Sequence, residues 1–191
     1  NEISLLTGTS ERLIELVKTQ TVDIAIACTK KIDESFFAQK YLFSEPSVLA
    51  LPKEPRFEKD FFTWEELRFC GLPFLRYNRF SGGSEMTENF LNSLFIHLPN
   101  RIEVDDGGVM LKLICKGIGW SLVRPATLVQ HPDLAAQVHF CKMPDPVMQR
   151  EVILIFGKSV NPELVDTVET LSKSFYEAEL SKEFKKILQQ K

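Results

Sequence analysis

The residues in this sequence best suited to binding chemistry lie at the start of an expected helix. Thr9 and Ser10 follow an apolar run that ends at Gly8, and they precede a helical apolar stripe that begins at Leu13. A strand that ends beneath a helix N-terminus presents free N–H groups and the positive end of the helix dipole, which favour a carboxylate, phosphate or sulfate. A second interpretation stays open, in which Ser10 only caps its own helix.

Two further polar side chains end other expected strands. Asp105 closes one strand and Arg124 follows another, so the two side chains could line one crevice at the edge of a sheet. The alternative is an ion pair between Asp105 and Arg124 that only fixes the two strand ends. The following Gly107-Gly108 favours a tight strand-to-helix turn over a ligand contact.

Catalytic and metal-binding patterns are not found in the sequence. It contains no GxSxG, P-loop or HExxH motif. The histidines His97, His131 and His139 have no nucleophile or metal partner nearby in the chain. We therefore expect no enzyme activity, no catalytic residue, no cofactor and no metal site, although distant residues can meet in a fold.

Charge and cysteine usage limit the class of partner. The net charge is −3, and Lys and Arg concentrate only in the short region 182–186, so the chain lacks a nucleic-acid footprint of its own. Its four cysteines show no CxxC or Cys/His spacing, which favours reduced thiols in the cytoplasm. No export leader and no apolar run of membrane-spanning length is present, so we expect a cytoplasmic chain that does not contact a membrane.

The pattern of apolar residues predicts an α/β fold. Residues 4–27 are typical of a strand, a helix and a second strand, that is, a βαβ unit. Residues 22–27 are too apolar for a half-exposed strand and indicate a parallel sheet covered on both faces. Further strands and helices alternate along the chain, and an Asn-Pro pair at Asn161 predicts the start of a last helix.

A break near Pro46 and a return near Phe156 divide the chain. We expect two Rossmann-like lobes joined by two crossover strands, with the second lobe inserted into the first. The predicted bounds are residues 1–47 and 153–191 for the first lobe and residues 48–152 for the second.

Several segments, in this order, resemble the effector-binding (substrate-binding) domain of LysR-type transcriptional regulators: TGTSERLIELVKTQTVDIAIA, FSEPSVLALPKEP, LICKGIGWSLVRPATL and REVILIFGKSVNPELVDTVETL. The resemblance covers residues 3 to about 175. It implies two lobes similar to type 2 periplasmic binding proteins, with a small effector in the cleft between them, and the helix starts and Arg79 favour an anionic one. It also implies an N-terminal winged helix-turn-helix that binds DNA, and this element, together with the first strand and helix of the domain, does not occur in the sequence.

Carried over residue by residue, the resemblance assigns one wall of the effector site to Thr9 and Ser10. The opposite wall falls on Asn78, Arg79, Phe80 and Ser81. Arg79 can offer a bidentate fork to a carboxylate, Phe80 an apolar face, and the residues after it exposed N–H groups at a helix start. A solvated surface arginine is the alternative for Arg79. Arg124 stands where the family more often has a nonpolar residue.

Three classes of function compete at this point. The first is the sensing domain of a DNA-binding regulator, which the family implies to be a homodimer here and a tetramer at full length, pairing through residues 10–20 and 38–43. The second is a periplasmic-type solute-binding protein for a small anion, and the unpaired cysteines argue against it. The third is an enzyme, but the sequence contains none of the catalytic motifs considered above.

Overall fold

The computed structural model describes residues 3–28, 37–78, 82–182 and 184–185. The chain divides into two compact units. The first comprises Asn1–Glu45 and Arg150–Glu177, and the second comprises Pro46–Gln149 and Ala178–Lys191. No helix in the described part is both long enough and apolar enough to span a bilayer. The lobe bounds expected from the sequence stay a prediction.

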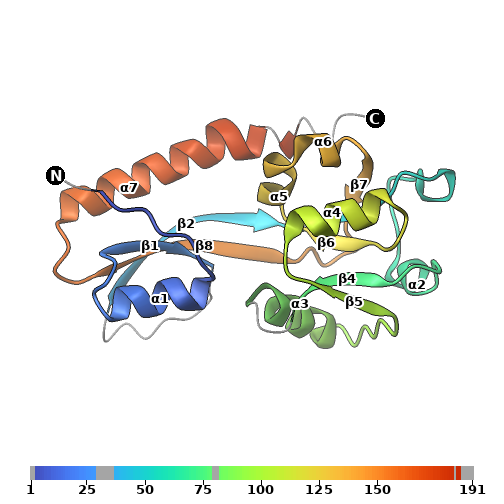
Figure 1. The fold of residues 1–191 in the computed structure, drawn as a ribbon, viewed down its shortest axis with the longest axis horizontal. Coiled ribbons are helices and arrows are strands. Elements are labelled where there is room, and N and C mark those ends of the chain that lie inside the picture. The colour runs from blue at the N-terminus through green and yellow to red at the C-terminus, as the bar shows by residue number, and fades with distance from the viewer. Residues whose placement is uncertain (1–2, 29–36, 79–81, 183, 186–191) are drawn as a thin grey trace. The chain divides into compact units, whose positions relative to one another are not determined.

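The first unit is a three-stranded sheet between two helices (Figure 1). Its strand order is β1-β8-β2, and β1 runs antiparallel to β8. Alternate residues of β8 face opposite layers: Ile153 and Ile155 pack with Val17 of α1, whereas Val152 and Leu154 pack with Val165 of α7. The elements are α1 (Ser10–Lys18), β1 (Ile24–Ala27), β2 (Phe37–Pro46), β8 (Gln149–Gly157), α7 (Pro162–Phe175) and a π-helical turn (Tyr176–Leu180).

Two expectations for this unit are wrong. Residues 3–9 form no strand, and the side chains of Ile3 and Leu5 are 84% and 90% exposed, so the βαβ unit is incomplete. No described strand pairs with this segment, and a strand needs a hydrogen-bonded neighbour. The parallel sheet expected at residues 22–27 is also wrong, because β1 is antiparallel to β8. The expected burial on both faces is also incomplete, because Ala25 and Ala27 are buried whereas Ile26 is 44% exposed.

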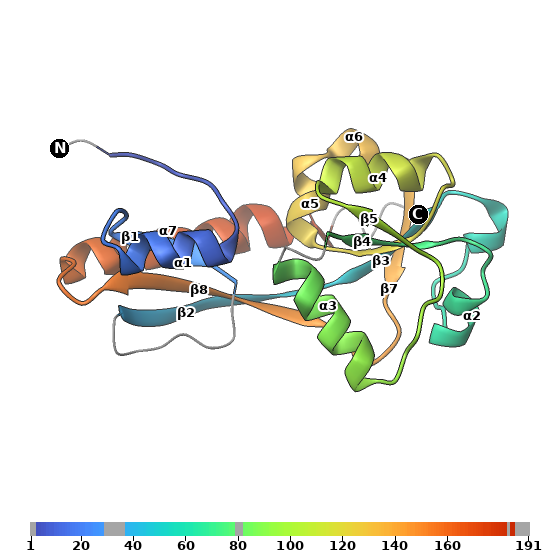
Figure 2. The ribbon, with the colours of Figure 1, turned by 60° about the horizontal axis from the view of Figure 1, so that its bottom comes forward.

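The second unit contains the larger core. An antiparallel ladder has the order β6-β3-β7, while β4 and β5 form a parallel pair that lies side by side in Figure 2. A parallel bridge between Phe74 and Trp120 connects the two ladders. The elements are β3 (Val48–Pro52), a 3₁₀ turn (Pro55–Phe57), α2 (Trp64–Arg68), β4 (Phe74–Tyr77), α3 (Gly82–Ser93), β5 (Arg101–Val104), α4 (Gly107–Cys115), β6 (Ser121–Val123), α5 (Pro125–Gln130), α6 (Pro132–Ala135) and β7 (Val138–Lys142).

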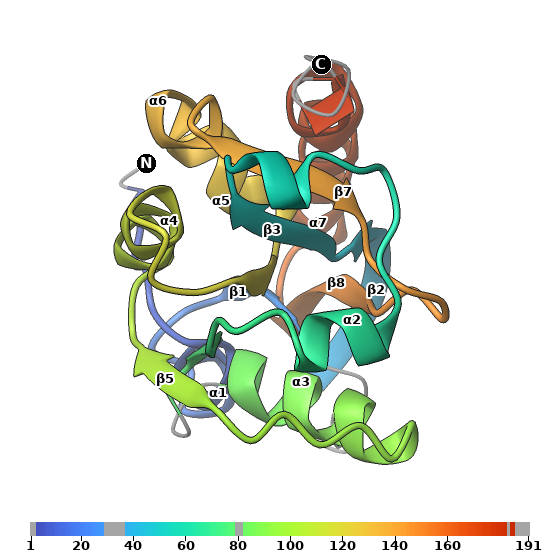
Figure 3. The same cartoon turned by 90° about the vertical axis from the view of Figure 1, so that its right-hand side faces the viewer.

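Helices cover both faces of this sheet as well (Figure 3). Leu49 and Leu51 of β3 face a cluster that includes Leu67 of α2 and Leu91 of α3. Val48 and Ala50 face the opposite cluster, which contains residues of α4, α5 and α6. The period-2 alternation of β3 therefore sorts its side chains between two hydrophobic cores.

Local signals set several helix ends, and the last helix begins where the sequence predicts it. Thr63 forms a capping box with Glu66 at the start of α2. Asn161 caps α7 through a 2.9 Å hydrogen bond from the Glu163 N–H, with proline at the next position. Gly117, at φ +71°, follows the end of α4 in the left-handed conformation that glycine adopts without strain.

The four cysteines form no disulfide. Cys141 is buried in the core beside Leu49, and burial raises the pKa of its thiol to about 12. Burial also raises the pKa values of Cys70 and Cys115. These thiols are protonated at neutral pH and pack as small apolar groups.

Candidate effector site

Three strands of the second unit end at one edge. The β4–β5 pair is parallel, and the Leu75 N–H donates to Trp120 O just before β6. At the far end of β4 the Asn78 N–H donates to Val104 O over 2.9 Å. After these strands come the starts of α3, α4 and α5. The carboxyl ends of parallel strands are the usual place for a ligand in an α/β sheet, because helix N-termini gather there.

Arg124 holds a fixed position at this edge. Its guanidinium carbon lies 5.3 Å from the centroid of the Tyr77 ring, a cation–π contact. The guanidinium also lies against Gly83 of α3, so closely that a Cβ atom there would collide with it. Among the described residues Asp105 forms no ion pair with Arg124, so the interpretation in which this pair only fixes the strand ends is wrong. The arginine charge therefore lies at the start of α3.

The glycine pair, expected to form a strand-to-helix turn, instead makes up the first two residues of α4, where it permits close approach. Asp106 caps the helix by accepting a 2.9 Å hydrogen bond from the Val109 N–H. A Cβ on Gly107 would lie 2.7 Å from Thr127 Cγ2 and 3.1 Å from the Tyr77 hydroxyl. A Cβ on Gly108 would lie 2.9 Å from the His131 ring. Only glycine at both positions allows these side chains to approach the first turn of α4.

An ionic network fixes α3 against β4 and β5. Glu88 of α3 accepts hydrogen bonds from Arg76 (2.8 Å) and Arg101 (2.7 Å), and Arg76 also pairs with Glu103. Burial alone would raise the pKa of Glu88, but the hydrogen bonds from Arg101 and Arg76 outweigh burial and lower it. The network holds the helix whose first residues contact Arg124.

The hydroxyl residues expected from the first unit have structural partners. Thr9 is the N-cap of α1, because its Oγ1 accepts a hydrogen bond from the Arg12 N–H (3.4 Å). Ser10 Oγ accepts a hydrogen bond from the Cys28 N–H (3.0 Å) just beyond β1. The interpretation in which Ser10 only caps its helix is therefore wrong: Thr9 is the cap, and Ser10 joins the start of α1 to the end of β1.

The expected site residues fall in separate parts of the chain. Asn78, Asp105 and Arg124 lie at one edge of the second unit, and Thr9 and Ser10 lie in the first. Arg79, Phe80 and Ser81 lie outside the described residues. Sequence reasoning did not identify the three side chains that approach the start of α4, which are Tyr77, Thr127 and His131.

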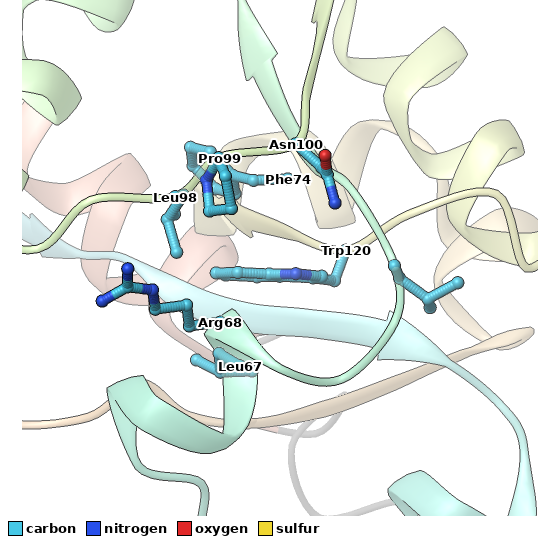
Figure 4. A pocket seen from close by; sticks show the side chains of 8 residues that line it. Leu67, Arg68, Phe74, Leu98, Pro99, Asn100 and Trp120 are labelled. Carbon is cyan, nitrogen blue, oxygen red and sulfur yellow. The ribbon is translucent and has the colours of Figure 1, made fainter.

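A recess elsewhere in the second unit is too small for an effector. This recess lies at the amino end of β4, and in Figure 4 the Trp120 indole runs beneath Leu98 and Pro99 and above Leu67. It has space for about one water molecule. Within residues 3–28, 37–78, 82–182 and 184–185, no group of three or more His, Cys, Asp or Glu side chains could hold a metal ion.

Solved structures share this fold. The reduced regulatory domain of OxyR from Pseudomonas aeruginosa matches with a TM-score of 0.71 and 16% identity, over 86% of this chain and 79% of that one. The regulatory domain of CcmR from Synechocystis PCC6803, in complex with 2-PG, matches with a TM-score of 0.73 and 16% identity, over 90% and 84%. The MetR regulatory domain of N. meningitidis matches with a TM-score of 0.71 and 14% identity, over 93% of this chain and 81% of that one.

The fold is therefore that of LysR regulatory domains, which resemble type 2 periplasmic binding proteins, as predicted. No curated protein matches the chain in sequence. The model of the LysR substrate binding domain matches residues 1–172. This match confirms the resemblance seen in the sequence, and the chain belongs to the LysR substrate binding domain family.

Proposed function

We propose that this chain is the sensing domain of a LysR-type transcription regulator and that its effector is a small anion. The observation that carries the proposal is the arginine charge of Arg124, held on Tyr77 at the edge where α3, α4 and α5 begin. A cation and helix N-termini together favour a carboxylate or phosphate. The CcmR domain was solved with 2-PG, and its fold is similar.

The effector acts by binding one conformation of the regulator more tightly than another. Such a ligand shifts the equilibrium only by its difference in affinity for the two states. In our proposal this shift reaches DNA through a helix-turn-helix domain of the full-length regulator, not through the acidic chain described above. A homodimer through residues 10–20 and 38–43, and a tetramer at full length, stay predictions.

The proposal retains the expected contacts from Thr9, Ser10 and the segment 78–81. Ser10 Oγ accepts the Cys28 N–H but still has its own O–H to donate to an anion. We expect Arg79→Ala to weaken effector binding by about 1.5–3 kcal/mol, and Ser10→Ala by less. The family and fold are regulatory, which disfavours both an enzyme and a solute-binding protein.

The test begins with native mass spectrometry of the full-length regulator from its own cells, which identifies a co-purified effector. Calorimetry then compares Arg124→Gln with Arg56→Gln. Arg56 is a matched control, because its guanidinium carbon also lies over a ring, 4.6 Å from the Phe57 centroid, but in a 3₁₀ turn. We expect Arg124→Gln to weaken binding about 10- to 100-fold and Arg56→Gln to leave it unchanged.

Two results would contradict the proposal. One is an effector that carries no negative charge. The other is equal affinity in the wild type and Arg124→Gln while both remain folded by circular dichroism.

A further inference from the structure

Two polar side chains that have no hydrogen-bond partner among the described residues meet at the start of α4. Thr127 is only 7% exposed, yet its hydroxyl forms no hydrogen bond with any described residue. The Tyr77 hydroxyl likewise has no hydrogen-bond partner in the described part of the chain. Both approach Gly107, at 3.3 Å and 3.1 Å from the position of a Cβ. Thr127 is a buried side chain and Tyr77 a half-buried one, and a polar group removed from water without a partner costs stability.

The backbone at this place also offers donors. Asp106 accepts two hydrogen bonds from the first turn of α4. Its carboxylate accepts one from the Val109 N–H, and its backbone carbonyl oxygen accepts one from the Met110 N–H. The N–H groups of Gly107 and Gly108, the first two of α4, have no acceptor among the described residues. These groups carry the partial positive charge of the nine-residue helix.

The charges around the start of α4 have both signs. Arg124 contributes a positive charge through its position over Tyr77. The Asp106 carboxylate is already bonded to the helix it caps. Asp105 is exposed to solvent, which screens its charge. The group that fits is therefore compact and has several acceptor oxygens, because the unpaired groups at Gly107 are two N–H and two O–H donors.

We propose that the start of α4 is an oxyanion subsite, in which the N–H groups of Gly107 and Gly108 and the hydroxyls of Thr127 and Tyr77 bind one carboxylate or phosphate group. This inference rests on the proposed function and names residues that receive the charged end of the effector. The missing Cβ atoms of the two glycines provide the space, since a methyl group at Gly107 would contact both hydroxyl side chains.

The test is an NMR titration of the ¹⁵N-labelled chain with inorganic phosphate and, separately, with acetate. In the wild type we expect saturable shifts of the Gly107 and Gly108 amide signals, and the two probes distinguish a phosphate from a carboxylate subsite. Thr127→Val and Tyr77→Phe each remove one hydroxyl with little change of shape. We expect each variant to bind the preferred probe about fivefold more weakly, the usual effect of one lost hydrogen bond.

Matched controls come from the first unit. Thr167→Val removes a hydroxyl that donates to Glu163 O, and Tyr41→Phe removes one that donates to Ser44. Neither control should change probe binding.

Two outcomes overturn the subsite. In one, the wild type shows no saturable shift at Gly107 and Gly108 with either probe. In the other, both Thr127→Val and Tyr77→Phe, folded by their amide spectra, bind as tightly as the wild type. An anionic effector found by mass spectrometry, combined with either result, removes the subsite but leaves the proposed function intact.

Discussion

The two units use hydroxyl groups near helix starts in opposite ways. In the first unit, Ser10 Oγ accepts a hydrogen bond from the Cys28 N–H, which joins α1 to β1. In the second, Thr127 is more deeply buried, but its hydroxyl has no hydrogen-bond partner in the described part of the chain. The same chemical group thus stabilises the fold in one unit and remains available in the other.

The ion pairs of the two units differ in how deeply they are buried. In the first unit, Glu45 is 1% exposed and pairs with Arg150, and its second oxygen Oε1 has no hydrogen-bond partner among the described residues. In the second, Glu88 shares its charge between Arg76 and Arg101 in a more exposed network. The first unit therefore holds one deeply buried pair beside a more exposed network in which Lys40 pairs with Asp166 and Glu169, whereas the network around Glu88 in the second unit is only partly buried.

The largest expected effect is on the buried pair. Arg150→Met leaves the Glu45 carboxylate buried without its counter-charge and should lower the free energy of unfolding by about 3–5 kcal/mol. Urea unfolding followed by circular dichroism measures this change. The double variant Glu45→Leu/Arg150→Met should recover most of the loss, because no isolated charge remains. Wild-type stability in Arg150→Met would show that the first unit does not depend on this pair.

The second prediction concerns the shared network. Glu88→Gln should lower the free energy of unfolding by about 1.5–3 kcal/mol at neutral pH, since it removes a charged partner of two arginines. Tryptophan fluorescence follows this unit, because Trp64 and Trp120, the two tryptophans of the chain, both lie in it. The exposed Glu58→Gln is the control.

The pH dependence of the same network has a definite sign. The pKa of Glu88 is lowered in the folded chain, so its contribution to stability is present above the ordinary glutamate pKa of about 4.3 and is lost as pH falls through the lowered value. In Glu88→Gln, the free energy of unfolding should therefore fall less at acidic pH than it does in the wild type. An unchanged pH dependence would assign the acid sensitivity to other carboxyl groups.

Helix ends were predictable from the sequence, because a cap and its partner lie within one turn. Thr63 and Glu66, or Asn161 with the following proline, are read without any knowledge of the fold. Strand pairing is not local. The apolar pattern near Leu5 is typical of a strand, but no described strand lies beside it, and its side chain is exposed.

The candidate site was predictable to the same limited extent. Arg124 was identified as a candidate because its charge is visible in the sequence, whereas the glycines at 107 and 108 were expected to form a turn and not to contact a ligand. Thr127 and Tyr77 were not identified, because their approach to Gly107 depends on how α5 and β4 pack against α4. The hydrogen bond from the Cys28 N–H to Ser10 Oγ could not be predicted for the same reason, because the two residues are 18 positions apart.

A smaller effect is expected at Ser10. Ser10→Ala removes the acceptor of the Cys28 N–H and should lower the free energy of unfolding by about 1 kcal/mol. Chemical denaturation measures the change, and Ser174→Ala in α7, an exposed helical position, controls for helix propensity. Equal stability of the two variants would mean that water replaces the lost hydrogen bond.

The smallest effect is expected at Thr127, and its smallness is informative. Thr127→Val keeps the branched shape of a buried side chain and removes a hydroxyl that bonds to no described residue. A buried polar group without a partner contributes no hydrogen bond to lose, so the free energy of unfolding should stay within about 0.5 kcal/mol of the wild type or rise. The measurement is the same denaturation series used for Ser10→Ala. A loss of 1 kcal/mol or more, about the worth of one hydrogen bond, would show that Thr127 stabilises the fold as Ser10 does, and the contrast between the two units would disappear.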